Sequence, residues 1–120
     1  MSEKTYQTGL DGEETARRFL ESKGMIFVQN RYKCMCGEID LIMLDGETLV
    51  FTEVKTRLSG KAGNGLLAVN KKKQDRIARA AVIFMKERNR NRVKARFDVI
   101  EVNRDGIIHI KDAFHPGNPV

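Results

Sequence analysis

The hydrophobic pattern is densest in the middle of the chain. In residues 38–44, and again in residues 49–54, apolar side chains occupy both sets of alternating positions. This pattern is typical of strands that are covered on both faces. The Asp45-Gly46 pair between the two runs is a strong signal for a short hairpin. The pattern therefore predicts two central, antiparallel strands.

Shorter periodic segments surround this hairpin. Apolar residues at helical spacing predict one helix before it and a second after Asn70, a good N-terminal cap. The remaining segments alternate as strands do. The expected elements are a helix from about Thr8 or Asp11 to Lys23, a strand over residues 25–32, a helix from Asn70 to about Asn89, and strands over residues 96–102 and 107–111. The order α-β-β-β-α-β-β predicts an α/β fold with a mixed β-sheet flanked by helices, in which the second helix is a crossover.

The length of 120 residues suits a single domain, expected to span residues 1–120. Glycines at positions 60, 63 and 65 predict a flexible loop near residues 57–69. This loop is either a cover for bound substrate or a simple connection. Both prolines fall in residues 115–120, where we expect a poorly ordered tail.

Charged residues interrupt the two central strands. Because side chains alternate along a strand, Glu38 and Asp40 share one face of the first strand, and Glu53 and Lys55 share one face of the second. A two-residue turn at Asp45-Gly46 would pair Glu38 with Glu53, whereas a four-residue loop would pair Asp40 with Glu53. Both registers gather the four charges together. A three-residue loop without a bulge would divide them between the faces, so the turn decides the outcome.

Carboxylates gathered on a half-buried surface repel one another and lose hydration unless a cation compensates. Mg²⁺ commonly binds one or two carboxylates and retains several waters, and Asp40 and Glu53 can supply these ligands; Mn²⁺ is a second candidate. Lys55 could then orient an attacking water or stabilise charge on a phosphate oxygen, and Glu38 is a candidate additional acid. The alternative is that Glu53 and Lys55 simply neutralise each other at a solvated strand end.

Positive charge is concentrated in the second half of the chain. The formal net charge is +6; residues 1–60 hold 8 basic and 10 acidic side chains, whereas residues 61–120 hold 14 and 6. A metal site made of acids needs a basic surface nearby to attract a phosphate backbone, although a solvated charged surface would show the same imbalance. The candidate nucleic-acid contacts are basic residues at the end of the second central strand, along the second helix and just after it: Arg57, Lys72, Arg76, Arg79, Arg88, Arg90 and Arg92.

Three further features bear on the setting of the protein. The sequence has no long apolar run and no charged segment followed by an apolar one at its start, which predicts a cytoplasmic protein that is not in a membrane. Cys34 and Cys36 are expected to be free thiols, with a zinc site as the alternative. His109 is expected to be an ordinary edge-strand histidine, because no carboxylate lies at a meaningful sequence spacing from it.

Several short segments together resemble a known family. They are Gly12-Glu13, Asn30-Arg31-Tyr32, GEID at 37–40, FTEVKTR at 51–57, the lysine-rich segment near Lys71, and Arg96-Phe97-Asp98. With these segments the chain resembles the PD-(D/E)xK nuclease superfamily. More closely, it resembles the small bacterial YraN family, regarded as relatives of archaeal Holliday-junction resolvases. Residue 39 is isoleucine where the superfamily's name has proline, but the aspartate that follows is in place.

The resemblance implies a restriction-endonuclease-like core and a metal-dependent endonuclease that hydrolyses DNA, with branched or flap DNA as candidate substrates. It also implies that Asp40 and Glu53 bind Mg²⁺, that Lys55 is the catalytic lysine, and that Glu13 matches an acid on the first helix of many resolvase-like members. A resolvase that cuts two strands needs two sites, so a homodimer is expected. Two other functions stay open: a nucleic-acid-binding module of the same fold without turnover, and an interaction protein whose basic surface meets an acidic partner.

Overall fold

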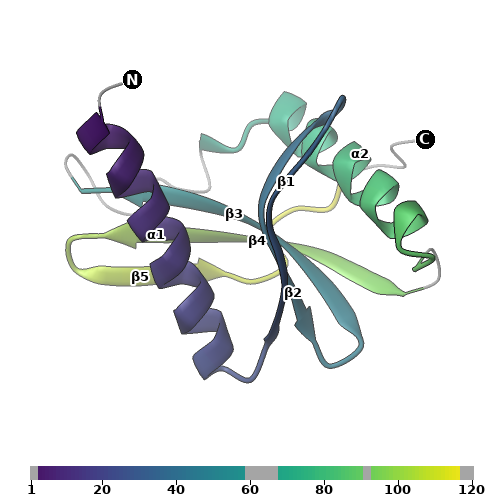
Figure 1. The fold of residues 1–120 in the computed structure, drawn as a ribbon, viewed down its shortest axis with the longest axis horizontal. Coiled ribbons are helices and arrows are strands. Elements are labelled where there is room, and N and C mark those ends of the chain that lie inside the picture. The colour runs from purple at the N-terminus through teal and green to yellow at the C-terminus, as the bar shows by residue number, and fades with distance from the viewer. Residues whose placement is uncertain (1–2, 59–67, 91–92, 117–120) are drawn as a thin grey trace.

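The computed structural model describes residues 3–58, 68–90 and 93–116, with side chains from residue 11 onward. The elements are α1 (Glu3–Ser22), β1 (Ile26–Cys34), β2 (Gly37–Asp45), β3 (Thr48–Arg57), α2 (Lys71–Glu87), β4 (Lys94–Asn103) and β5 (Gly106–Ile110). The expected order α-β-β-β-α-β-β is therefore confirmed (Figure 1).

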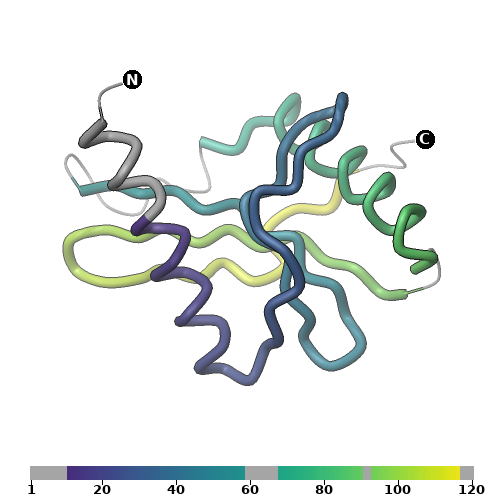
Figure 2. Tube along the Cα trace, in the orientation of Figure 1, coloured from purple at the N-terminus to yellow at the C-terminus, as the bar shows by residue number. Residues whose placement is uncertain are grey.

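The five strands form one mixed sheet in the order β1-β2-β3-β4-β5. Neighbouring strands are antiparallel except β3 and β4, which are parallel and are joined through α2. Figure 2 follows the chain as a meander through β1, β2 and β3, and later from β4 directly back into β5. The predicted fold class is confirmed, and the arrangement is consistent with a restriction-endonuclease-like core.

The two helices cover opposite faces of the sheet. On one face, Ala16 and Leu20 of α1 belong to the same buried cluster as Leu41, Met43 and Val50. On the other face, the buried α2 residues Ile77, Ala81 and Phe84 cluster with Ile42, Leu49 and Phe51. The central strands are thus covered on both sides, which explains why both of their alternating positions are apolar.

The β2–β3 hairpin has the register that places the candidate carboxylates together. Asp45 pairs with Thr48, so the turn consists of Gly46 and Glu47, and Gly46 adopts a φ of +61° that suits glycine. Leu44 pairs with Leu49, so the register is the one expected for the four-residue loop, and the alternative two-residue turn at Asp45-Gly46 is wrong. The register runs to Leu41 and Thr52, so Asp40 and Glu53, which come next, lie opposite each other.

The first helix begins at Glu3, so the prediction that it starts at Thr8 or Asp11 is wrong. No proline interrupts residues 3–10, so the helix continues through the residues proposed as its caps. Its predicted end is correct, because Gly24 adopts a φ of +93°. A Cβ at Gly12 would overlap the Thr56 side chain, so this glycine lets α1 lie directly against β3.

Two predictions fall on parts of the chain that are only partly described. The loop expected near 57–69 covers residues 59–67, which lie outside the described residues, while Arg57 ends β3 and Val69 is buried. In the expected tail, residues 117–120 also lie outside the described residues. Within the described ranges, no helix is long and apolar enough to cross a membrane. Cys34 and Cys36 are free, as expected.

Candidate active site

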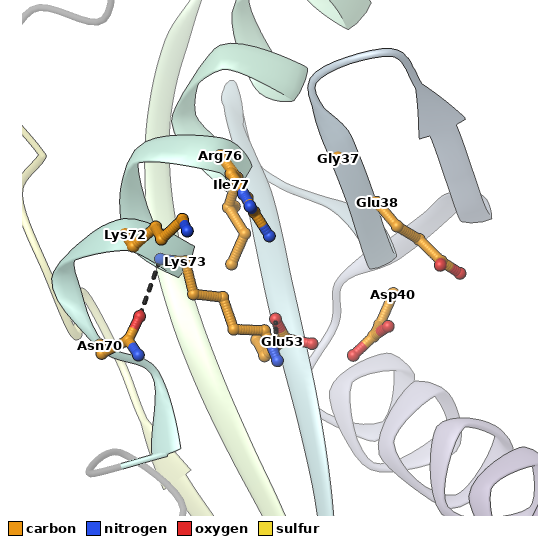
Figure 3. Close-up of a pocket in the computed structure, with 9 residues that line it drawn as sticks. All are labelled: Gly37, Glu38, Asp40, Glu53, Asn70, Lys72, Lys73, Arg76 and Ile77. Carbon is orange, nitrogen blue, oxygen red and sulfur yellow. Dashed lines mark hydrogen bonds and ion pairs between the residues drawn. The ribbon is translucent and has the colours of Figure 1, made fainter.

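Asp40 and Glu53 face each other across β2 and β3 on the side of the sheet that α2 covers. They lie in a pocket of about 450 Å³ at the beginning of α2 (Figure 3). We call it the carboxylate pocket; it is lined by Gly37, Glu38, Asp40, Glu53, Asn70, Lys72, Lys73, Arg76 and Ile77. Glu53 is 6% exposed, so its charge lies at the floor of the pocket rather than at the solvated strand end that was the alternative.

The surroundings of Asp40 oppose its ionisation. Burial and the neighbouring Glu53 carboxylate raise the pKa of Asp40 to about 8, even though Lys55 and a backbone donor act in the other direction. That donor is the N–H of Val54, which lies 2.9 Å from Asp40 Oδ2. The site therefore holds two close carboxylates with less compensating charge than both need when ionised.

Two lysines reach these carboxylates from different elements. Lys55 follows Glu53 on the same face of β3, and burial, together with contact from Lys73, lowers the pKa of Lys55. Lys73 extends from the first turn of α2, with its Nζ 3.4 Å from Glu53 Oε2. Contacts with Lys55 and Glu53 raise the pKa of Lys73, although burial opposes this. Sequence reasoning missed Lys73, although it lies in a run of three lysines at the predicted helix start.

Local sequence fixes the start of α2 beside the pocket. Asn70 caps the helix as predicted, because its Oδ1 accepts a hydrogen bond of 2.9 Å from the N–H of Lys73. Gly37 begins β2, and a Cβ there would lie 3.3 Å from the Cβ of Arg76. The glycine therefore allows close contact between helix and strand, which brings Lys72 and Arg76 to the pocket wall.

A third buried carboxylate lies next to Lys55 and was also missed. Glu101 on β4 is 1% exposed and pairs in register with Lys55 on the parallel neighbour β3. The Asn103 amide lies two residues further on and donates a hydrogen bond of 2.8 Å to Glu101 Oε2. Glu101 and Asn103 are polar residues at alternate positions of a strand whose other residues are largely buried. This pattern is a sequence signal that could have revealed them.

The two other predicted acids lie at the margins of the site. Glu38 is exposed and lines the carboxylate pocket. Glu13 forms an ion pair of 2.9 Å with Arg31 and lines a different hollow of about 400 Å³ beside α1. Burial and the Asp40 charge raise the pKa of Glu13, so its carboxylate lies near enough to sense Asp40 without lining the same pocket.

The predicted nucleic-acid contacts fall into two groups. Lys72 and Arg76 line the carboxylate pocket, and the exposed Arg79 follows them along α2. Arg88 and Arg90 lie beyond the other end of this 17-residue helix, which is about 25 Å long at 1.5 Å per residue. Arg88 Nη2 donates to Gln29 Oε1 at 2.7 Å, Arg90 lines a separate pocket of about 460 Å³ and Arg57 donates to the Thr56 carbonyl. Arg92 lies outside the described residues.

His109 lies on the edge strand β5, as expected, but it has a carboxylate partner that its sequence spacing did not suggest. Its Nε2 lies 2.8 Å from Oδ2 of Asp98, which is fully buried on the α1 side of the sheet. Antiparallel pairing of Ile100 with His109 makes Asp98 a diagonal cross-strand neighbour, a relation that sequence spacing does not reveal. Arg96 and the Asp112 N–H also donate to Asp98, and we call these residues with His109 the Asp98 cluster.

Asp40 and Glu53 are the residues that could hold a divalent cation. Among the described residues, no group of three or more His, Cys, Asp or Glu side chains is arranged to hold a metal ion. Two facing carboxylates nevertheless suit Mg²⁺, which usually takes one or two carboxylates and completes its octahedron with waters and substrate phosphate. The arrangement can thus bring a cation, a lysine and a phosphate together.

Comparison with known proteins gives a consistent result. The model of the uncharacterised protein family UPF0102 matches residues 12–102. A UPF0102 protein of Syntrophus aciditrophicus is 42% identical over 115 residues, covering 92% of this chain and 91% of the relative. A UPF0102 protein of Desulfosudis oleivorans is 40% identical over 116 residues, covering 95% and 94%. The matched segment contains Glu13, Asp40, Glu53, Lys55 and Glu101.

Proposed function

We propose that this chain, which belongs to the uncharacterised protein family UPF0102, is a metal-dependent endonuclease that hydrolyses DNA phosphodiester bonds. One observation carries the proposal: Asp40 and Glu53 face each other in an open pocket, with Lys55 next on the same strand face. A sheet interior ordinarily excludes such a set of charges because desolvation is costly. The resemblance to PD-(D/E)xK nucleases supports the same reading of these three residues.

The donor set fits Mg²⁺, or Mn²⁺ in its place. Asp40 accepts a single backbone hydrogen bond through Oδ2, so it retains lone pairs for a cation. A bound divalent cation supplies Lewis-acid polarisation of a phosphoryl oxygen and activates water. Asp40 and Glu53 orient that cation, and their mutual repulsion is relieved when it binds.

Lys55 and the cations of α2 act on the substrate. The Lys55 side chain lies beside the carboxylates, where its ammonium can stabilise charge that develops on the phosphate, or its amine can orient the attacking water. Lys72 and Arg76 at the pocket wall hold neighbouring phosphates of the backbone. These contacts carry no base information, so we expect the shape of the DNA, such as a branch or flap, to determine selectivity.

The test is cleavage of a labelled panel of linear, flap, fork and four-way DNA with Mg²⁺ or Mn²⁺. We expect metal-dependent cleavage by the purified protein and its loss in Asp40→Asn and Glu53→Gln. Glu14→Gln, at an exposed α1 position, is the matched control that removes one carboxylate outside the pocket. Because symmetric cleavage of a four-way junction would need two sites, the oligomeric state is measured on the same samples.

The outcomes of this test separate the alternatives. Cleavage that persists unchanged in Asp40→Asn would indicate a contaminating nuclease and overturn the proposal. Metal-independent binding of all substrates without turnover would instead favour a nucleic-acid-binding module. Absence of DNA binding by the folded protein would favour an interaction protein whose basic surface meets an acidic partner.

A further inference from the structure

The first turn of α2 places a cation where a helix usually disfavours one. Residues 71–73 are all lysine, and the first turn contains no acidic residue. The amino end of a helix carries partial positive charge, which disfavours each of these lysines. Departures from such local rules are often found at functional sites, where they serve something other than stability.

Lys73 differs from its two neighbours in what it contacts. Lys71 pairs with Asp75 on the surface, and Lys72 is exposed at the pocket wall. Lys73 turns inward, and its Nζ lies 3.4 Å from Oε2 of Glu53, a side chain that is only 6% exposed. The Asn70 cap fixes the backbone of Lys73, and the side chain extends from there toward Glu53 (Figure 3).

The pair is close but not tight. Charge-assisted hydrogen bonds between nitrogen and carboxylate oxygen are usually about 2.7–2.9 Å long, and this one is longer. The Lys73 side chain is also 38% exposed, so its ammonium can leave Glu53 for solvent within the pocket. Lys55, by contrast, extends from the central strand β3.

We propose that Lys73 is a built-in counter-ion of Glu53 that a divalent cation must displace, and that it thereby sets the metal affinity of the site. This inference rests on the proposed metal site at Asp40 and Glu53. A cation about 2.1 Å from a Glu53 oxygen takes the position toward which the ammonium points, and the two positive charges repel. Lys73 thus weakens metal binding, and its displaced ammonium stays in the pocket with Lys72 and Arg76.

The test is Mn²⁺ binding to the full chain without DNA, measured by electron paramagnetic resonance or calorimetry. Lys73→Gln is expected to bind Mn²⁺ about 5- to 30-fold more tightly, the factor that corresponds to one or two kcal/mol of lost competition. Lys71→Gln is the matched control, since it removes one charge from the same helix turn at a residue that pairs with Asp75 outside the pocket, and it should change the affinity less than about twofold. Lys73→Arg should stay near the wild-type affinity, because it retains the charge.

The results distinguish this inference from the proposed function. Wild-type protein that binds Mn²⁺ through Asp40, with no change in Lys73→Gln, would overturn the counter-ion role and leave the metal site intact. Equal tightening in Lys71→Gln would also overturn it, since the effect would then come from net charge alone. No Mn²⁺ binding by wild type or Lys73→Gln, both folded by melting curves, would reject the metal site and the inference together.

Discussion

Two carboxylate sites lie on opposite faces of the same sheet, Asp40 and Glu53 on β2 and β3 and Asp98 on β4, and they differ in how their charge is compensated. Asp98 pairs in register with Thr52 on β3. Thr52 directly precedes Glu53, and adjacent residues of a strand point to opposite faces, so the two sites are close but lie on opposite sides of the sheet. Asp98 Oδ1 accepts from Arg96 Nε at 3.1 Å and from the Asp112 N–H at 2.9 Å, while Oδ2 lies 2.8 Å from His109 Nε2. Burial alone would raise the pKa of Asp98, but these donors lower it overall.

Asp40 has the opposite balance. One backbone N–H supports its carboxylate, Glu53 repels it, and its pKa is raised to about 8. A carboxylate whose hydrogen bonds are saturated is a structural group, because it has nothing left to offer a ligand. A carboxylate left short of donors costs stability and keeps its lone pairs for a cation. The comparison therefore supports a structural role for the carboxylate on the α1 face and is consistent with the proposed metal site on the α2 face.

The largest effect on stability is expected at Asp98. Asp98→Asn removes the charge that Arg96 and His109 share in a buried position, and we expect a loss of about 3–5 kcal/mol in the free energy of unfolding. Because the pKa of Asp98 is lower folded than unfolded, its contribution is present at neutral pH and is lost in acid. Urea titrations at pH 7 and at about pH 2, below the ordinary pKa of an aspartate, measure this, with the exposed Asp105→Asn as control. Equal stability of the two variants would contradict a structural role for the Asp98 cluster.

The next effect concerns rate rather than stability. Lys55→Ala should lower single-turnover cleavage about 10²- to 10³-fold, the range for removing one positioned electrostatic donor. Lys55→Arg should rescue poorly, because a planar guanidinium presents its donors differently. The exposed Lys33→Ala on β1 is the charge-matched control, and DNA binding is measured beside it in Ca²⁺. A parallel loss of binding and rate would make Lys55 a phosphate anchor instead.

Asp40 should respond to pH in the direction opposite to Asp98. Its pKa is higher folded than unfolded, so wild-type stability falls between pH 4 and pH 8, by at most about 1.4 kcal/mol per pH unit. Asp40→Asn cannot ionise, and we expect its advantage over wild type to be about 1–3 kcal/mol larger at pH 8 than at pH 5, measured with a chelator present. Glu38→Gln, on the same strand but exposed, should show no such trend. If the difference in unfolding free energy between Asp40→Asn and wild type did not change with pH, burial and Glu53 would not be opposing the ionisation of Asp40.

The sequence predicts what depends on local chemistry and misses what depends on docking. Alternation and the Asp45-Gly46 signal were enough to predict an antiparallel hairpin that gathers the charges, but they left open whether Glu38 or Asp40 lies opposite Glu53, a choice that the observed register decides for Asp40. Lys73 was missed because its approach to Glu53 depends on where α2 lies on the sheet, which helical spacing alone does not determine. Asp98 and His109 meet through a diagonal across two strands, and Glu101 pairs in register with Lys55 across the parallel strands β3 and β4, which a crossover joins. None of these pairs is separated by a sequence interval that would predict the contact.

The smallest effect compares two arginines with different partners. Arg96 is held by Asp45 and Asp98, so its charge is already used within the fold. Arg76 lines the carboxylate pocket and, among the described residues, has no ion pair or side-chain hydrogen bond. If Arg76 contacts a phosphate, Arg76→Gln should reduce the slope of log affinity against log salt on duplex DNA by about 0.9, equally for unrelated sequences.

Arg18→Gln provides the matched control for this last measurement. Arg18 is exposed on α1 and pairs with Glu14, so its loss changes the net charge by the same amount on the other face of the sheet. Affinities are measured by fluorescence anisotropy at salt concentrations from about 50 to about 200 mM, a range over which counterion release changes DNA affinity strongly. An equal change of slope in Arg18→Gln would mean that DNA senses the net charge of the protein and not the wall of the pocket. A change confined to Arg76→Gln would place a phosphate beside Asp40 and Glu53, where the proposed chemistry requires one.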